Sequence, residues 1–401
     1  MTAIVTYARN RIALTITRSL AQKGIRVITA DNISPAMSFY SKHSSGHFLY
    51  SSPMSSPSKF IDDLILKANE YNASTIIPVH EETYIISEHK DALLQHGIGI
   101  AVSDYASIVR LNNKSESTTA AQELGIPTPK TWRPETVEEV SKCADELCYP
   151  AVIKLRKGRG SIGLQYVGDA PSLVKWFKKT VDEYHLKESN LPLIQQYITG
   201  KGIGVSMILD HGTPLATFVH ERCRELPLTG GTSTERRSIR FPEAEEYSQR
   251  LLSNLKWHGV AMVEFKVDKS THKPYFLEIN PRFWGSLNQA VVSGVDFPYL
   301  LYQLSQGEKI QPITEYELGT KSIWFFGQIR TLLDCIKTPR QWGTLVSGTA
   351  SLFSKDVHFD DLSLRDPLPT LTEPIFALKQ LCTKGKLTFE TEEELVKNVP
   401  F

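Results

Sequence analysis

The 401-residue sequence lacks several features that would mark other classes of protein. It has five cysteines, an odd number, and no two of them form a Cys-x-x-Cys pair. A reduced, cytoplasmic protein is therefore the simplest interpretation. No apolar run approaches the ~20 residues of a membrane span. The first residues, MTAIVTYARN, lack the basic-then-apolar pattern of a signal peptide.

Net charge is also nearly absent. The formal charge of +1 gives no electrostatic reason to expect a nucleic acid or an anionic membrane as a partner. Hydrophobic residues make up 41% and charged residues 22%, which is ordinary for globular proteins. The length suggests roughly two to four domains.

Glycine is missing from the first turn of the chain, where a dinucleotide-binding site would need it. Ala3–Thr6 and Ile25–Ala30 read as strands around a helix at Ile12–Lys23, but the turn Tyr7–Arg11 contains no glycine. An NAD site is therefore not expected there. Later stretches continue the alternation of strand and helix, which predicts a parallel α/β sheet. These stretches are Lys59–Tyr71 (helix), Ser74–Val79 (strand), Thr83–Gln95 (helix) and Ile98–Val102 (strand).

Two pairs of charged residues lie where this first domain would bind a ligand. Arg9 and Arg11 precede a helix N-terminus, where anions are favoured, although surface arginines are an equal alternative. Glu81 and Glu82 follow the carboxyl end of a strand, where open α/β sheets place ligands. The alternative is that these two carboxylates charge the start of the next helix.

The motifs of a protein kinase are missing as well, although one feature resembles them. Lys154 lies in an apolar strand, and Gly158–Gly163 (GRGSIG) follows it and leads into another strand. A glycine loop between two strands can cover a phosphate, because bare amides approach the anion closely. In kinases the lysine comes after the glycines, and no HRD or DFG triplet occurs here. A kinase is therefore disfavoured.

Among the features that are present, the stretch Tyr275–Arg282 (YFLEINPR) is the most informative. Glu278, Asn280 and Arg282 are two residues apart, so in an extended strand they share one face. Carboxylate and amide oxygens suit Mg²⁺, which keeps phosphate oxygens in its shell. The guanidinium could bind a phosphate or a carboxylate with its planar fork.

A second carboxylate is expected opposite this face. Gly259–Asp268 reads as the preceding strand, and with Thr271 in the middle of the hairpin Glu264 falls opposite Glu278. Two opposed carboxylates are unfavourable unless a cation lies between them. A solvated polar face is the alternative, but the neighbouring aromatic and aliphatic residues oppose it. The pattern predicts a metal site.

Two further stretches leave alternatives open. Leu193–Ile198 reads as a strand. Its backbone could contact the edge of a purine, or it could be an ordinary strand of a sheet. The basic, glycine-containing stretch Arg222–Arg237 predicts a mobile loop that receives an anion, with an ordinary solvated loop as the alternative. In residues 310–401 the sequence indicates helices but no catalytic constellation.

Lys154 with its glycine loop, Glu264 and the Glu278–Arg282 motif together resemble the ATP-grasp superfamily. Arg222 and Arg224 with TGGTS, and the DPLP segment near residue 366, are similar to carboxylate–amine ligases of the carbamoyl-phosphate-synthase-like and D-aspartate-ligase-like group. The resemblance implies ATP and two Mg²⁺ ions, with Mn²⁺ as the alternative ion. It also implies roles for residues along the chain: nucleotide binding by Lys114, Lys154, Gly158, Gly160, Ser161, Gly163, Gln195, Gln196, Tyr197 and Ile198, metal binding by Glu264, Glu278 and Asn280, and catalysis by Lys154 and Arg282.

The sequence departs from this family at one position. An acidic residue that contacts the ribose usually follows the strand that edges the adenine, whereas this chain has Gly202, and Gln195 stands where an acidic residue is common. Adenine preference is thus less firmly implied than the metal site.

The resulting hypothesis is an α/β and α+β protein with a ligase activity. It would form an amide from a small-molecule acid and an amine through an acyl phosphate. Carbamoyl-phosphate-type chemistry and a non-catalytic nucleotide-binding protein are the alternatives, and a homodimer is considered. Selectivity would come from substrate contacts with Glu81, Glu82, Arg222, Arg224 and Arg237. The expected domains are an α/β domain at 1–110, two ATP-grasp subdomains at 111–192 and 193–309, and an extension at 310–401.

Overall fold

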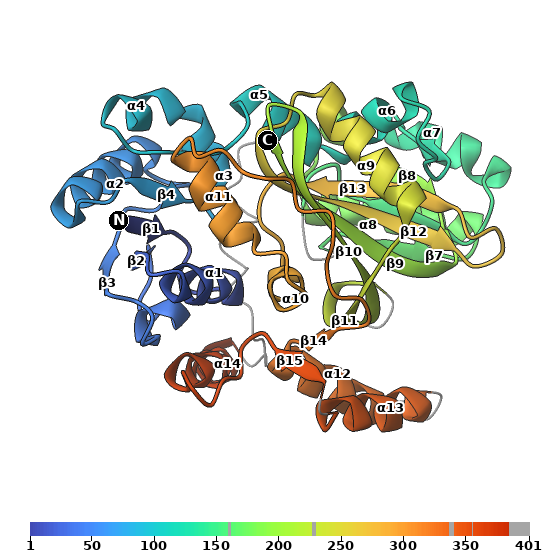
Figure 1. Cartoon of the computed structure of the whole chain (residues 1–401). Coiled ribbons are helices and arrows are strands. Elements are labelled where there is room, and N and C mark those ends of the chain that lie inside the picture. Colours follow the sequence, from blue (N-terminus) through green and yellow to red (C-terminus); the bar gives the residue numbers. More distant parts are fainter. Residues whose placement is uncertain (159–161, 227–229, 337–340, 355, 385–401) are drawn as a thin grey trace.

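The computed structural model describes residues 1–158, 162–226, 230–336, 341–354 and 356–384. The chain forms three lobes built on three sheets, one parallel and two largely antiparallel. Figure 1 shows the N-terminal lobe, in blue, at the left of the large sheet. The expected combination of α/β and α+β parts is confirmed. No helix of these described residues is long and apolar enough to cross a membrane.

The N-terminal lobe is a four-stranded parallel sheet in the order β3-β2-β1-β4. The strand expected at Ile98–Val102 is wrong, because this segment makes a single bridge from Gly99 to Thr75. The helix expected at Thr83–Gln95 is interrupted at His89, which ends one helix and begins the next. The elements of this lobe are β1 (Thr2–Val5), α1 (Arg11–Gln22), β2 (Arg26–Asp31), β3 (Gly46–Leu49), α2 (Pro57–Tyr71), β4 (Thr75–Ile77), α3 (Glu82–Glu88) and α4 (Lys90–Gln95).

Local sequence explains where α1 begins and ends. The Asn10 side chain accepts a hydrogen bond from the backbone N–H of Ile12 at 2.9 Å, which satisfies one of the free donors of the first turn. Gly24 follows the helix with φ of +79°, a conformation that glycine adopts without strain. The start of α1 is thus fixed next to the carboxyl ends of β1 and β4.

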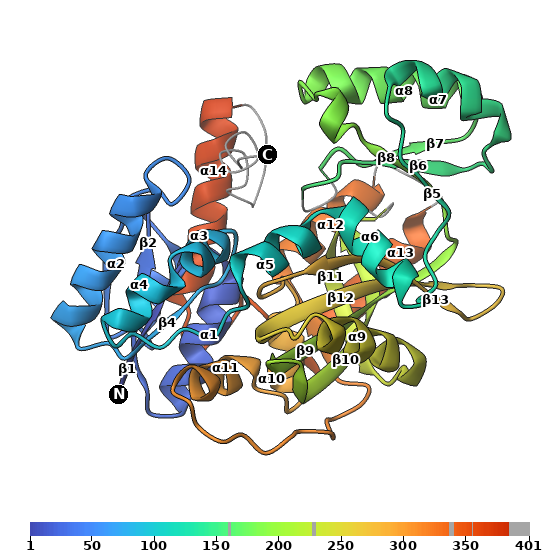
Figure 2. The same cartoon turned by 90° about the horizontal axis from the view of Figure 1, so that it is seen from above.

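The second lobe is a small antiparallel sheet in the order β5-β8-β6-β7, covered by two helices. Figure 2 shows it standing apart from the N-terminal lobe. It has its own core, built around Ile153, Phe177 and Ile194. The elements are β5 (Thr131–Trp132), α7 (Val137–Cys143), β6 (Ala151–Lys154), β7 (Gln165–Val167), α8 (Ala170–Glu183) and β8 (Leu193–Gln196).

The third lobe is a seven-stranded sheet in the order β13-β12-β9-β10-β11-β14-β15. Its last two strands come from residues beyond 310, so this part of the chain extends the sheet. The strands are β9 (Gly200–Asp210), β10 (Thr213–Leu226), β11 (Thr232–Ile239), β12 (Gly259–Asp268), β13 (Pro274–Asn280), β14 (Lys321–Ile323) and β15 (Val357–Phe359). The helices are α5 (Tyr105–Asn112), α6 (Lys114–Glu123), α9 (Pro242–Asn254), α10 (Leu287–Val292), α11 (Phe297–Ser305), α12 (Phe325–Ile336), α13 (Trp342–Leu352) and α14 (Thr372–Lys384).

One apolar core joins the first and third lobes. Ile12 and Val79 of the N-terminal lobe pack in the same cluster as Phe218, Phe283 and Trp284 of the third lobe. Burial of large aromatic side chains is among the strongest contributions to such an interface. The first and third lobes therefore form a common base, over which the small second lobe lies (Figure 2).

Candidate active site

The metal face predicted from the sequence lies on the paired strands β12 and β13. Glu264 is directly opposite Glu278 in the register, as expected. A β-bulge produces this pairing, because Phe265 pairs with Phe276 and Leu277 is the extra residue on β13. Without the bulge, Glu264 would lie opposite Leu277. Such bulges re-aim side chains at functional sites.

Cations of the chain neutralise both carboxylates. Lys114 Nζ lies 2.9 Å from Glu278 Oε2. Arg222 Nη2 lies 2.5 Å from Glu264 Oε2, and Asn280 Nδ2 donates to Glu264 Oε1 at 3.0 Å. Two half-buried or buried acids and an amide thus converge on one spot, together with the positive charge that their opposition requires.

The two carboxylates differ in their pKa. Burial raises the pKa of Glu264, and the charge of Arg222 offsets this in part. For Glu278, burial also acts to raise the pKa, but Lys114 and Lys154 outweigh it, so that its pKa is lowered. Glu278 is therefore the more firmly ionised of the pair at neutral pH.

Lys154, at the end of β6, faces the same carboxylates from the second lobe. Burial lowers its pKa to about 8, although Glu278 acts in the opposite direction, and Lys114 adds to the lowering. Lys114 lies at the start of α6, and its Nζ also donates to the carbonyl of Gly158 at 2.8 Å. The two lysines therefore approach Glu278 from two different lobes.

Arg282 connects this face to the N-terminal lobe. Its Nε and Nη2 atoms lie 3.3 and 3.2 Å from Glu81 Oε1, and its Nη1 donates to the carbonyl of Phe283 at 2.8 Å. Glu82 makes different contacts. Its carboxylate accepts from Thr6 Oγ1 at 2.6 Å and from the backbone N–H groups of Val79 and His80.

A cavity runs from these charges to the second lobe. Lys114, Lys154 and Gly158 line it, with Tyr166 of β7 and all four residues of Gln195–Ile198. The buried Gln195 side chain donates to Thr131 Oγ1 at 3.0 Å. Gly163 is adjacent to this wall, whereas Gly160 and Ser161 lie outside the described residues.

Gly202, the departure noted in the sequence, lines the same cavity. A Cβ atom at this position would lie 3.1 Å from Arg222 Cδ and 3.6 Å from Glu225 Oε1. Glycine therefore leaves room for the Arg222 side chain to reach Glu264. The carboxylate of Glu225 lies beside the position at which an acidic residue is usual.

The loop expected at Arg222–Arg237 is wrong for its described residues. Most of them belong to β10 and β11, which pair with each other through two register irregularities; residues 227–229 lie outside the described part. Arg222 lines the cavity. Arg224 forms an ion pair with Glu235 and donates to Ser347 Oγ at 3.1 Å. Arg237 Nη2 lies 3.3 Å from Glu221 Oε1. The structure thus places these three arginines in three different environments.

The end of the cavity at the first and third lobes contains residues that were not chosen as site residues from the sequence. Arg11 of α1, His80 after β4, and Gly285 and Ser286 after the Glu278–Arg282 motif line it. Arg9, in contrast, is bound to Asp31 and Asn32. Ser286 could have been chosen as a site residue from the sequence, because it lies close to Arg282 in the chain. Arg11 was considered from the sequence as an anion-binding residue at the start of a helix, but its position in this cavity wall depends on the packing of α1 against the large sheet.

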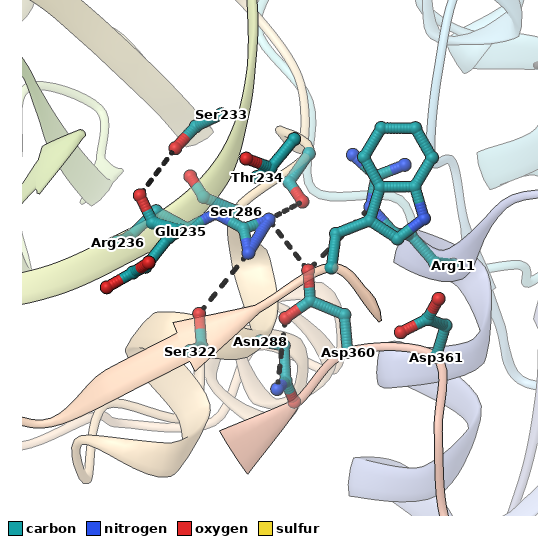
Figure 3. A network of polar contacts seen from close by, with 12 residues as sticks. Arg11, Ser233, Thr234, Glu235, Arg236, Ser286, Asn288, Ser322, Asp360 and Asp361 are labelled. Carbon is teal, nitrogen blue, oxygen red and sulfur yellow. Dashed lines mark hydrogen bonds and ion pairs between the residues drawn. The ribbon is translucent and has the colours of Figure 1, made fainter. Parts of the chain in front are cut away.

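Behind this wall lies a buried charged network, shown in Figure 3. Arg236 Nη2 lies 2.7 Å from Asp360 Oδ2, and Arg11 Nε is 3.7 Å from the same oxygen. Arg236 also donates to the carbonyl of Gly285 at 3.3 Å. Burial, and then the charge of Asp360, raises the pKa of the neighbouring Asp361 to about 6. The network therefore joins the wall of the cavity to the residues after β15.

Comparisons with known proteins show which family this three-lobed fold and its charged cavity resemble. Residues 188–324 match the family described as "ATP-grasp in the biosynthetic pathway with Ter operon". The carbamoyl phosphate synthase large chain of Thermoanaerobacter sp. (strain X514) is 24% identical over 242 residues, which are 58% of this chain and 22% of that protein. The chain thus spans about a fifth of the length of this relative.

Two solved structures have the same fold. The biotin carboxylase domain of Hydrogenobacter thermophilus 2-oxoglutarate carboxylase, a dimer in complex with MgADP, ADP and bicarbonate, has a TM-score of 0.65 and 18% identity, covering 80% of this chain and 73% of that one. N5-carboxyaminoimidazole synthetase from Staphylococcus aureus, complexed with ADP, has a TM-score of 0.63 and 15% identity, covering 80% of each chain. The resemblance to the ATP-grasp superfamily seen in the sequence is confirmed by the family match over residues 188–324, and the two solved structures share the fold of this chain.

Proposed function

We propose that the chain is an ATP-dependent ligase that joins a carboxylate to an amine through an acyl phosphate. The observation that carries this proposal is the meeting of Glu264 and Glu278 with Lys114, Lys154 and Arg282 around one cavity. Acidic and basic groups in this arrangement suit a reaction in which charge moves between phosphate oxygens. Positioning and electrostatic stabilisation are the main tasks of a protein in phosphoryl transfer.

The residues would divide the work as follows. Lys114 and Lys154 bind phosphate oxygens of ATP, and Arg282, held in place by Glu81, faces the acid. A carboxylate oxygen attacks the γ-phosphorus, and the bond to ADP breaks. The amine then attacks the acyl carbon, phosphate leaves, and the amine loses a proton. Arg282 stabilises the oxygens that become more negative in both steps.

The donor set fits Mg²⁺. Glu264, Glu278 and Asn280 offer hard oxygen ligands from two adjacent strands, and the opposed carboxylates favour a cation between them. When bound, Mg²⁺ would neutralise phosphate charge and orient the γ-phosphate. Two ions are proposed, with Mn²⁺ as a substitute. The solved relatives bound to ADP and MgADP support a nucleotide with this metal.

For the substrates, the proposal includes a small acid and an amine. Glu81 is the candidate for an ammonium group, and Arg222 for an anion, since both lie within or beside the cavity. Arg224, Arg237 and Glu82 are not among the residues that line the cavity, and they bind Glu235, Glu221 and Thr6, respectively. These three are weaker candidates than the sequence suggested. A homodimer and a cytoplasmic location remain predictions, and the dimeric carboxylase domain supports the first.

Bicarbonate is a second candidate for the acid, which would make the intermediate a carboxyphosphate. The similarity to a carbamoyl phosphate synthase, and to a carboxylase domain bound to bicarbonate, favours it. The chemistry at the γ-phosphate would be unchanged, because bicarbonate attacks through the same kind of oxygen.

The test is a measurement of ADP release with Mg·ATP over a panel of acids, each with and without a panel of amines. We expect release that depends on one acid and rises with one amine. A parallel series in bicarbonate-depleted buffer separates the second candidate, because carboxyphosphate formation would then stop. ADP release that responds to no acid and no bicarbonate would contradict ligase activity and favour a nucleotide-binding protein without turnover.

Lys154 allows a separate prediction on pH. Its pKa of about 8, lowered chiefly by burial from 10.5, makes the amine mostly neutral at pH 8.5. A bound polyphosphate favours the charged form and raises this pKa again, so binding of Mg·ADP at pH 8.5 should take up a proton. The affinity should therefore fall as the pH rises through 8. At pH 6.5 the lysine is already charged, and its contribution to proton uptake should vanish.

Calorimetric titrations in two buffers of different ionisation enthalpy measure this uptake. Lys154→Arg is the matched variant, because the guanidinium stays charged throughout this range. The wild type should show buffer-dependent heats at pH 8.5, and the variant should lose most of the difference. Identical heats for the wild type in both buffers would contradict the assignment of Lys154 to the phosphates.

A further inference from the structure

Ser286 occupies a helix N-cap but does not act as a cap. It precedes α10, and its side chain makes no hydrogen bond to the backbone of that helix. The capping side chains of Asn10 before α1 and Asp296 before α11 each accept such a bond. Serine is a preferred capping residue, so its use for another contact has a local cost.

That other contact is His220 of β10. The Ser286 Oγ and His220 Nε2 atoms are 3.1 Å apart, and His220 is completely buried. Gly204 is opposite His220 on β9, where a Cβ atom would lie 2.5 Å from His220 Cε1. The absence of a side chain at Gly204 therefore leaves the space that the His220 imidazole occupies.

The surroundings determine which nitrogen carries the proton. Burial lowers the pKa of His220 well below its usual value, and Arg222 and Arg236 lower it further, so the ring is neutral. His220 Nδ1 is buried without a hydrogen-bond partner among the described residues. An orphaned N–H group is rarer in proteins than an orphaned acceptor. This favours the tautomer with the proton on Nε2, in which the ring donates to Ser286 Oγ.

This tautomer leaves the Ser286 proton free to point into the cavity that the residue lines. It also argues against a serine nucleophile activated by histidine, because the imidazole acts as a donor and two arginines oppose its protonation. The hydroxyl is instead a hydrogen-bond donor of fixed position.

Arg11 lies beside Gly285, the residue before this donor. A Cβ atom at Gly285 would lie 3.0 Å from Arg11 Nη2, so the guanidinium borders the residue before Ser286. The same guanidinium lies over the Trp324 ring at 4.0 Å and beside Asp360, which fix its orientation. A hydroxyl donor and a cation on one cavity wall match the two oxygens of a carboxylate.

We propose that Ser286 and Arg11 form a carboxylate subsite for the acid substrate, in which Ser286, held by His220, donates a hydrogen bond to one oxygen. The proposal rests on the proposed ligase function for the identity of the substrate. The subsite itself can be tested without turnover, using acetate as the smallest carboxylate probe.

The first measurement is the tautomer of His220 by ¹⁵N NMR with labelled histidine, assigned by comparison with His220→Asn. We expect the pattern of an Nε2–H imidazole. An Nδ1–H pattern would overturn the proposal, because Ser286 would then donate to the ring and not to the cavity.

The second measurement is a titration with acetate against chloride at equal ionic strength, followed by the His220 signals. We expect a saturable change in the wild type. In Ser286→Ala the titration is followed by the backbone NMR signals of Gly285. The apparent affinity for acetate should fall about fivefold, which is the effect of losing one hydrogen bond of roughly 1 kcal/mol. Ser286→Thr keeps the hydroxyl and should retain most of the affinity.

Ser248→Ala is the matched control, because it removes a buried serine hydroxyl on α9 that bonds to the carbonyl of Ala244. It should bind acetate like the wild type. Equal acetate affinity in Ser286→Ala and the wild type, or no saturable response in the wild type, would overturn the subsite.

Affinity for Mg·ADP separates this proposal from the proposed function. It should stay within about twofold of the wild type in Ser286→Ala, since the lysines that face the phosphates are elsewhere. A larger loss would assign Ser286 to the nucleotide site and overturn the subsite. If no acid stimulates ADP release, the ligase function fails, while the acetate and tautomer results still decide the subsite.

Discussion

Replacing Glu278 by glutamine should reduce ADP production by about 10³-fold or more, because the site loses several kcal/mol of transition-state stabilisation. The amide has nearly the same shape as the carboxylate but lacks the negative charge that lies 2.9 Å from Lys114 Nζ and that would bind the proposed metal. Glu264 would be the remaining carboxylate of the opposed pair, and burial already raises its pKa. The variant therefore loses the acid that is more firmly ionised.

Glu221→Gln provides the matched control on the same sheet. Glu221 is on β10 and forms ion pairs with Lys201 and Arg237, away from the cavity lining. It should turn over ATP at nearly the wild-type rate, and both variants should unfold at similar denaturant concentrations. ADP production by Glu278→Gln within about threefold of the wild type would rule out the metal assignment.

The pairing of Glu264 with Glu278 shows what the sequence could predict. Alternation along β13 and an approximate hairpin centre at Thr271 were enough to identify the opposed carboxylates. The bulge at Leu277 was not predictable, because its signal is a single extra residue in an apolar run. Short polar motifs on strands next to a turn can thus be located from the sequence. The irregularity that aligns them is seen only in the hydrogen-bond pairing of the two strands in the structure.

The stretch around Arg222 and Arg224 shows where local signals fail. Glycines, threonines and arginines indicate a loop, but β10 continues through Leu226 because β11 pairs with it that far, whereas its pairing with β9 ends at Glu221. Strand preference depends on neighbouring strands more than on the residues themselves. In a regular strand Arg222 and Arg224 would share one face. The register irregularities on either side of Arg224 break this period, so that Arg222 lines the cavity and Arg224 does not.

The wall behind Ser286 could not be predicted, since it joins opposite ends of the sequence. Arg11 comes from the start of the chain, Arg236 from its middle and Asp360 from the segment for which no site was expected. No pattern of spacing connects such residues. Their contact depends on the packing of α1 against the large sheet and on the addition of β15 to the edge of that sheet, which are properties of the complete fold.

The largest loss of stability should follow the replacement of Asp360 by asparagine. Arg236 is completely buried and has Asp360 at 2.7 Å, and Arg11 lies 3.7 Å from the same oxygen. Removing one partner of a buried ion pair leaves an uncompensated charge and costs about 3–5 kcal/mol. The midpoint of urea unfolding should fall accordingly. Asp356→Asn, on the exposed surface of the same segment, should leave the midpoint unchanged.

A double-mutant cycle distinguishes this ion pair from simple loss of packing. Arg236→Met should also destabilise the protein, because Asp360 and Asp361 would then lie together with less positive charge. Asp360→Leu is the second single variant of the cycle. The double variant Arg236→Met/Asp360→Leu should recover part of the loss, since apolar residues of similar volume often replace a buried ion pair at little cost. If the two single changes simply add, the two residues are not coupled, and the network of Figure 3 does not hold the cavity wall in place. Recovery of stability without recovery of acetate binding would separate the two tasks of the network, because Arg11 would lose the neighbour Asp360 that orients it beside Ser286.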